Sequence, residues 1–222
     1  MMTKINLDTN EIKQAVDRSQ HCQRNWDISK KIQTQDLEVL EHVVANCPSK
    51  QNIGFYNAYF IQDRNKVQQV HDQTDGFVTN TTTGETVTNS QTLANLLIVF
   101  TSRSLKEWSK GHEHRNIELD SYVADEETPS QYLKNLDNDA KLAVGIAAGY
   151  VNIIATMMGY ATGYCSCYDN EGIKKVLDTD DNVMLLLGVG IPDNNRNRLE
   201  HHLDPSIIFP SKEKVKINIV HV

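Results

Sequence analysis

The stretch that decides the fold is LAVGIAAGYVNIIATMMGYATGYCSCY, residues 142–168, which carries no charged side chain. A short amphipathic segment follows at 171–177, and then a second apolar run, VMLLLGVGIP, at residues 183–192. This order predicts a long buried helix, a short strand, a short helix and a central strand. Such a pattern is typical of a domain in which a sheet packs against one very apolar helix.

A membrane-spanning helix is the alternative interpretation of residues 142–163, because the stretch is long enough to cross a bilayer. Against it, Asn152 and Thr156 place polar groups along the stretch, and no cluster of lysine or arginine flanks it to set an orientation. A helix that is apolar all round is also typical of a protein core. We therefore expect a core or dimer-interface helix and no membrane insertion.

The other elements are expected to complete one domain that spans residues 1–222. Apolar periodicity and capping residues predict a helix from Asp8 or Thr9 to about Ser19, and a second from Thr34 to Cys47. The pattern further predicts strands at 57–61 and 93–100, a short helix at 67–70, a loop or hairpin at 76–90 and a helical excursion at 102–138. Residues 214–219 alternate as a half-exposed strand does, and such a strand needs a sheet edge, which a partner subunit could provide.

Composition narrows the class of protein. A net charge of −7 without a basic cluster argues against nucleic-acid binding. Residues 1–10 lack the apolar centre of a secretion signal, so the four cysteines are expected to be free thiols in a reducing cytoplasm. Cys165 and Cys167 are expected to point the same way along a strand. Neither they nor the HEH triplet at 112–114 has enough credible ligands nearby for a metal site.

Three polar segments have the chemistry of ligand-binding turns. The segment at 20–26 places a histidine and an arginine three residues apart just past a helix end, where they can hold a phosphate. The segment at 48–52 offers serine and asparagine side chains that can bind a planar amide edge. The segment at 195–198 carries two arginines with the same side-chain direction, which also suit a phosphate. Each segment taken alone is more often simply a solvated surface.

Taken together, these segments resemble the nitroreductase-like flavoproteins. QHCQRNWD at 20–27, followed by a helix that ends in CPSKQN at 47–52, resembles the N-terminal signature of that family. The long Gly/Ala-rich helix, the strand at 163–169, and LLLGVG at 185–190 with Arg198 downstream resemble its C-terminal half. The Pro-Ser-x-x-Asn element and the order of the blocks are the most specific parts of the resemblance, which covers most of the chain.

The resemblance implies an α+β fold in which helices flank a central, mainly antiparallel sheet. It also implies a homodimer with the long buried helix at the interface, a C-terminal strand exchanged with the partner, and FMN bound between the subunits. On the positions that match, the implied cofactor contacts are Gln20, His21, Cys22 and Arg24 in the first turn, Pro48, Ser49, Lys50 and Asn52 in the partner's turn, Tyr164, Cys165, Ser166 and Cys167 along the strand against the ring, and Arg196 and Arg198 at the phosphate.

This chain departs from the family pattern at several of these positions. Gln20 stands where arginine is usual and Cys22 where serine is usual, with Arg18 as a candidate replacement for the missing arginine. Tyr164 and Cys167 occupy strand positions at which glycine or proline is common. Their larger side chains are expected to narrow access to one face of the flavin.

An asparagine in the loop before the central strand contacts the flavin ring in this family. Asn89 and Asn80 both qualify for that role, and we favour Asn89. Lys50 or Arg24 would stabilise negative charge on the reduced cofactor. No catalytic acid or base is required, and none is assigned.

The implied activity is that of an FMN-dependent oxidoreductase. It would take hydride from NADH or NADPH and pass electrons to a nitro-aromatic, a quinone or a similar small acceptor in a ping-pong cycle. Two alternatives remain: a flavin-binding or flavin-processing protein of the same fold without general reductase turnover, and a dimeric interaction module without cofactor. The spectrum of the purified protein and the effect of removing Arg198 distinguish these alternatives.

Overall fold

The computed structural model describes residues 8–74, 76, 78–79, 86–103, 131–211 and 213–220. Its elements in chain order are α1 (Thr9–Ser19), α2 (Thr34–Ala45), η1 (Lys50–Asn52), β1 (Tyr56–Ile61), α3 (Arg64–His71), β2 (Val78–Thr79), β3 (Thr86–Val87), η2 (Ser90–Leu93), β4 (Leu96–Ser102), α5 (Gln131–Met157), β5 (Ala161–Cys165), α6 (Asn170–Leu177) and β6 (Val183–Gly190). Most of the excursion expected at 102–138 lies outside the described residues, and its last part, 131–138, is the start of α5.

The main sheet has four strands in the order β1-β4-β6-β5, and every neighbouring pair is antiparallel. The predicted α+β class with a central antiparallel sheet is therefore confirmed. The loop or hairpin expected at 76–90 contains the small β2-β3 pair. Leu93, which the apolar run assigned to the central strand, belongs instead to the 3-10 helix η2 that leads into β4.

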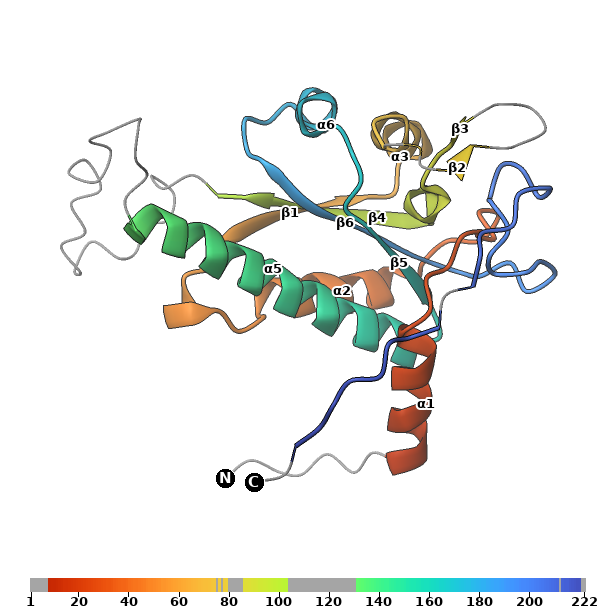
Figure 1. Cartoon of the computed structure of the whole chain (residues 1–222), viewed down its shortest axis with the longest axis horizontal. Coiled ribbons are helices and arrows are strands. Elements are labelled where there is room, and N and C mark those ends of the chain that lie inside the picture. The colour runs from red at the N-terminus through yellow and green to blue at the C-terminus, as the bar shows by residue number, and fades with distance from the viewer. Residues whose placement is uncertain are drawn as a thin grey trace.

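Helices cover both faces of this sheet, with α2 and α5 on one side and α3 and α6 on the other (Figure 1). The side chains of β4 alternate between the two layers: Leu96, Ile98 and Phe100 pack with α2 and α5, whereas Leu97 and Val99 pack with α3 and α6. Because neither face of β4 meets water, the strand is a continuous apolar run rather than an alternating one.

The long helix α5 has one buried and one exposed apolar face. Ala143, Ala147 and Val151 are among the residues that pack on the sheet. By length and composition, Asp137–Met157 could cross a membrane, but its buried face makes it the core helix of this fold. Along the other face, four large apolar side chains are exposed: Leu142 (65%), Ile146 (41%), Tyr150 (48%) and Met157 (42%).

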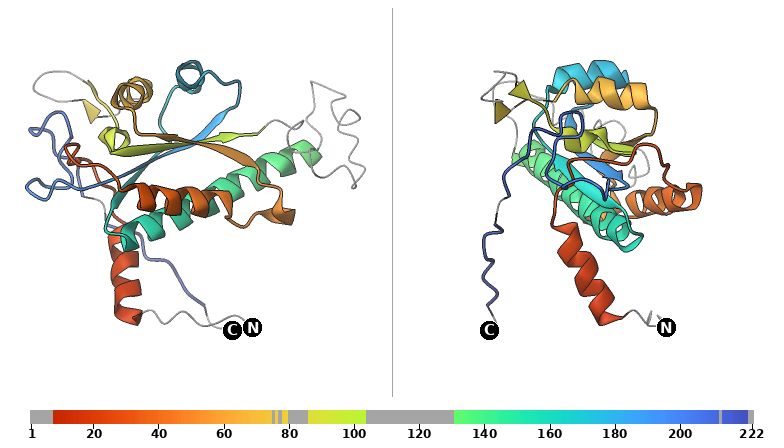
Figure 2. Two further views of the ribbon diagram at one scale, coloured as in Figure 1. Left: turned by 180° about the vertical axis from the view of Figure 1, so that it is seen from behind. Right: turned by 90° about the vertical axis from the view of Figure 1, so that its right-hand side faces the viewer.

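Helix α1 and the C-terminal segment 213–220 both project from the body of the protein on the side of α5 (Figures 1 and 2). The segment forms no strand within the single chain, and its alternating apolar side chains are exposed, Val215 by 86% and Ile219 by 79%. The expected strand at 214–219 therefore still needs an edge that this chain does not give it.

Candidate cofactor site

The turn after α1 forms one wall of a hollow of about 1000 Å³. Cys22 forms a parallel bridge with Thr162 of β5, and the Gln23 amide N donates to the Thr162 carbonyl O at 2.9 Å. Asn152 of α5 joins the two walls, because its Nδ2 donates to the Ser19 carbonyl O (3.0 Å) and its Oδ1 accepts from Thr162 Oγ1 (2.5 Å). The lining residues are Ser19, Gln20, His21, Cys22, Arg24, Asn152, Thr162, Tyr164, Ser211, Glu213 and Lys214.

Among the residues that the structure describes, two arginines beside this hollow have no acidic partner. Arg24 donates from Nη1 to Gln91 Oε1, and its guanidinium lies 4.2 Å over the centre of the Phe209 ring. Arg198 donates from Nη1 to the Cys22 carbonyl O at 3.3 Å, and its own carbonyl accepts from the Arg24 amide N at 3.0 Å. Within the described ranges, no carboxylate lies within salt-bridge distance of either guanidinium. Both charges are therefore available to an anion.

The structure separates the predicted basic pair Arg196 and Arg198. Arg196 donates from Nε to Glu200 at 2.9 Å, and from its other nitrogens to the carbonyls of His201 (2.7 Å) and His202 (3.1 Å). It therefore holds its own loop together, and only Arg198 reaches the first turn. The difference arises from the glutamate four residues after Arg196, which neutralises that guanidinium.

Two further titratable groups on this wall, Cys22 and Tyr164, have raised pKa values. Burial raises the pKa of the Cys22 thiol, although the charges of Arg24 and Arg198 oppose that effect. Burial also raises the pKa of Tyr164 to about 12, and its phenol donates to the Ala148 carbonyl O at 2.9 Å. Neither group therefore adds a negative charge near pH 7 that would offset the two arginines.

The segment 164–167 does not present all of its side chains to the hollow. Tyr164 lines it, whereas Cys165 is buried in the core between the sheet and α3 and α6, where burial raises its pKa to about 11. Ser166 and Cys167 are exposed. The expectation that Cys165 and Cys167 point the same way was wrong, because β5 ends at Cys165 and the strand alternation ends with it.

Asn89 is buried next to a glutamine that the sequence analysis did not single out. Gln91 Nε2 donates to Asn89 Oδ1 and to the Tyr164 carbonyl O, both at 3.1 Å, while its Oε1 accepts from Arg24. Asn89 thus belongs to the same cluster as the first turn. Asn80, the other candidate, lies outside the described residues.

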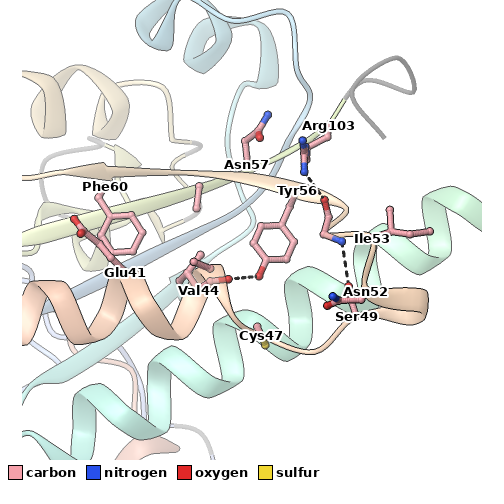
Figure 3. A pocket seen from close by; sticks show the side chains of 13 residues that line it. Glu41, Val44, Cys47, Ser49, Asn52, Ile53, Tyr56, Asn57, Phe60 and Arg103 are labelled. Atoms are coloured by element: carbon pink, nitrogen blue, oxygen red, sulfur yellow. Dashed lines mark hydrogen bonds between the residues drawn. The ribbon is translucent and has the colours of Figure 1, made fainter. Parts of the chain in front are cut away.

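The turn at 48–52 borders a different hollow, of about 650 Å³, between α2 and β1 (Figure 3). Ser49 Oγ accepts from the Gly54 amide N at 3.1 Å, and Asn52 adopts a left-handed conformation with φ 57°. Lys50 forms an exposed ion pair with Asp139 of α5, at 2.6 Å. Pro48 and Asn52 are exposed.

One chain does not bring the two predicted binding turns together. The turn at 48–52 is fixed to α5 at Asp139, and the turn at 20–24 adjoins α5 at Asn152. These anchor points are thirteen residues apart on the helix, which corresponds to about 20 Å. Within one subunit, only the groups around the larger hollow, with Asn89 and Arg198, form a cluster.

The fold and this cluster define a class of protein: an α+β domain with a cationic hollow between the turn after α1, the start of β5 and the C-terminal loops. Among the described residues there is no group of three or more His, Cys, Asp or Glu side chains that could hold a metal ion. The arrangement is suited to an anionic organic ligand rather than to a metal.

The chain belongs to the nitroreductase family, whose model matches residues 18–191, well over half of its length. A search of curated proteins finds no match. Among solved structures, a nitroreductase family protein from Streptococcus pneumoniae is 12% identical, with a TM-score of 0.60, 91% of this chain and 96% of that chain covered.

Two further structures have the same fold. A protein from Exiguobacterium sibiricum described as a nitroreductase in complex with FMN is 16% identical, with a TM-score of 0.60 and coverage of 96% of this chain and 100% of that one. A protein from Staphylococcus epidermidis described as an NAD(P)H:FMN oxidoreductase is 12% identical, with a TM-score of 0.63 and coverage of 98% and 94%. At 12–16% identity, these similarities show a shared fold only.

Proposed function

We propose that the protein is an FMN-dependent oxidoreductase that uses NADH or NADPH to reduce a nitro-aromatic, a quinone or a similar small acceptor by a ping-pong mechanism. When bound, FMN would supply the hydride acceptor and the electron donor to the second substrate. Membership of the nitroreductase family supports an oxidoreductase. The FMN in the Exiguobacterium structure supports this choice of cofactor.

The observation that carries the proposal is the pair Arg24 and Arg198 beside the hollow, which have no acidic partner in the described part of the chain. A half-buried guanidinium that lacks a carboxylate partner is costly unless a ligand provides the negative charge. The phosphate of FMN would provide this charge, and so would the negative charge on the reduced flavin. Gln20 and His21 line the same hollow and would complete the polar contacts.

We further propose that the working form is a cytoplasmic homodimer in which the turn at 48–52 serves the partner's hollow. The exposed apolar row on α5 supports a protein partner, because large apolar patches on a single chain usually mark an interface. The C-terminal segment 213–220 would pair with an edge of the partner's sheet. Four free thiols agree with a reducing compartment.

An absorption spectrum of the purified protein, before and after addition of FMN, tests the proposal. We expect a flavin spectrum that NADH or NADPH bleaches under anaerobic conditions. Replacing Arg198 by alanine should weaken FMN binding about tenfold or more, the loss typical of a charge-assisted hydrogen bond to a phosphate. The matched control is Lys175→Ala, which removes an exposed lysine of α6 on the opposite side of the sheet, and it should leave FMN binding unchanged. A colourless protein that takes up no FMN would contradict the proposal.

Tyr164 favours a second candidate, a flavin-binding protein of the same fold without general reductase turnover. Its side chain lines the hollow, with the phenol bonded to the Ala148 carbonyl O, and takes up space that a second substrate would need. Repeated turnovers with a small quinone distinguish the two. A single reduction by NADH without turnover on any acceptor would support the second candidate, and stable folding without any flavin would support an interaction module.

A further inference from the structure

Gln91 packs directly against two glycines, Gly163 and Gly188, on strands that are distant from it in the sequence. A Cβ atom on Gly163 of β5 would lie 2.6 Å from Gln91 Cβ, and one on Gly188 of β6 would lie 2.1 Å from the Gln91 carbonyl O. Any larger residue at either position would displace η2. Gln91 is 3% exposed, so both its backbone and its side chain are fixed before any ligand arrives.

The three hydrogen bonds of the Gln91 amide leave one orientation of that group. Nε2 donates to Asn89 Oδ1 and to the Tyr164 carbonyl O, and because both of these oxygens can only accept, they must face the nitrogen of the Gln91 amide. The remaining atom, Oε1, therefore faces Arg24 and accepts from its Nη1. Arg24, Asn89 and Tyr164, which come from three separate segments, are thus joined through one side chain.

The chemical character of Gln91 matters as much as its position. A glutamate would also accept from Arg24, but its charge would neutralise the guanidinium, as Glu200 does for Arg196 in the neighbouring loop. The amide oxygen of glutamine orients the guanidinium and leaves the positive charge uncompensated. On its other side, Arg24 stacks on Phe209, which is likewise uncharged.

We propose that Gln91 is a positioning residue that acts through Arg24: it directs the guanidinium toward the hollow while preserving its charge for the anionic cofactor. This inference rests on the proposed function. It makes two separable statements, one on the orientation of Arg24 and one on its charge. Each statement has its own variant.

The variant Gln91→Met removes the three hydrogen bonds at similar volume and adds no charge. We expect FMN to bind about tenfold more weakly, the loss of one charge-assisted hydrogen bond at the site. In an Arg24→Met background, the same change should alter FMN affinity by less than about twofold, because the double-mutant cycle isolates what passes through Arg24. An undiminished loss in that background would show that Gln91 acts directly on the ligand or only on the fold, and would overturn the inference.

The variant Gln91→Glu keeps an acceptor for Arg24 and neutralises its charge, and like Gln91→Met it loses the two donations of Nε2 to Asn89 Oδ1 and the Tyr164 carbonyl O. It should also weaken FMN binding by about tenfold, whereas Gln33→Glu, the same change at an exposed position, should not. Wild-type affinity in Gln91→Glu would contradict the statement on charge. Thermal unfolding of each variant shows whether the fold is retained.

A readout that needs no cofactor separates this inference from the proposed function. The Cys22 thiol lines the hollow within the field of Arg24, so its iodoacetamide labelling, followed by peptide mass spectrometry, reports where that charge lies. Gln91→Met should slow the labelling about twofold or more as Arg24 moves away. If the wild type takes up no FMN, the proposed function fails. Slower labelling of Gln91→Met would still support the inference that Gln91 orients Arg24. An unchanged labelling rate would overturn it.

Discussion

Lowering the pH from 7 to 4 should destabilise the protein through His71, a histidine of α3 that is only 2% exposed. Its imidazole lies between two hydroxyls, with Nδ1 2.9 Å from Thr92 Oγ1 and Nε2 2.8 Å from Thr88 Oγ1. Burial is the largest cause that lowers the pKa of His71, to about 4, and the charges of His201 and Arg64 act in the same direction. The carboxylate of Asp72 and the backbone at Asn89 oppose it.

The sign of the effect follows from where each state takes up its proton. An unfolded histidine titrates near pH 6.5 and the folded one near 4, so between these values the unfolded chain binds more protons. Stability from His71 is therefore fully present above about pH 6.5 and is lost as the pH falls toward 4. The difference of about 2.5 pKa units corresponds to about 2.5 decades in the unfolding equilibrium, and about 3 kcal/mol of it is lost by pH 4.

Urea unfolding at a series of pH values between 7 and 4 measures this contribution. Wild type should lose about 3 kcal/mol more than His71→Gln over that range, because glutamine keeps hydrogen-bonding groups at the site but does not titrate. His42→Gln, at an exposed position of α2, is the control and should follow wild type. If the stability curves of wild type and His71→Gln run parallel within about 0.5 kcal/mol, the buried neutral imidazole is not the source of acid sensitivity.

Three further predictions concern packing, assembly and the second turn. Gly188→Ala should lower the free energy of unfolding by about 3 kcal/mol, because the new Cβ would lie 2.1 Å from the Gln91 carbonyl O; an unchanged urea midpoint would mean that η2 shifts freely. Ile146→Glu, on the exposed face of α5, should convert a dimer to a monomer in sedimentation experiments, and a wild type that already sediments as a monomer would contradict the proposed interface. Lys50→Met should change stability by less than about 1 kcal/mol, since the Lys50 side chain is 57% exposed although Asp139 is only 15% exposed, but should weaken FMN binding if the turn serves the partner's site. Lys141→Met, which breaks an exposed lysine–aspartate pair with Asp137 elsewhere on α5, is the control and should leave FMN binding unchanged.

Most of the fold could be predicted because local patterns and tertiary burial agree. Asp8 caps α1 through the Asn10 amide N, and Asp169 caps α6 through the Glu171 amide N, as their positions before the apolar periodicity indicate. The continuous apolar runs of β4 and β6 arise because helices cover both faces of the sheet. Alternation at 214–219 predicted a strand, but a strand forms only where a neighbouring edge is present, and that information is not local.

The site was less predictable because its geometry depends on contacts between distant segments. Nothing near Gln91 in the sequence reveals that Gly163 and Gly188 leave room for it, or that it meets Arg24. The two arginines of the 195–198 segment look equivalent, and only Glu200, four residues after Arg196, indicates which of them is neutralised. Asn152 did carry a signal, since a lone amide in an apolar helix usually has a buried hydrogen-bond partner.

The proposed homodimer would give four features of the single chain a common physical explanation. The two binding turns lie about 20 Å apart along α5 because that helix is straight and each turn is fixed to a different part of it. The apolar row from Leu142 to Met157 faces outward, and the C-terminal segment exposes Val215, Ile217 and Ile219. Strand β1 has β4 on only one side, so its other edge is open within the described sheet. A second copy would cover the row, offer an edge to the segment and bring a second 48–52 turn toward the hollow, so a single association would satisfy all four features. Separate binding partners would have to satisfy each of them independently.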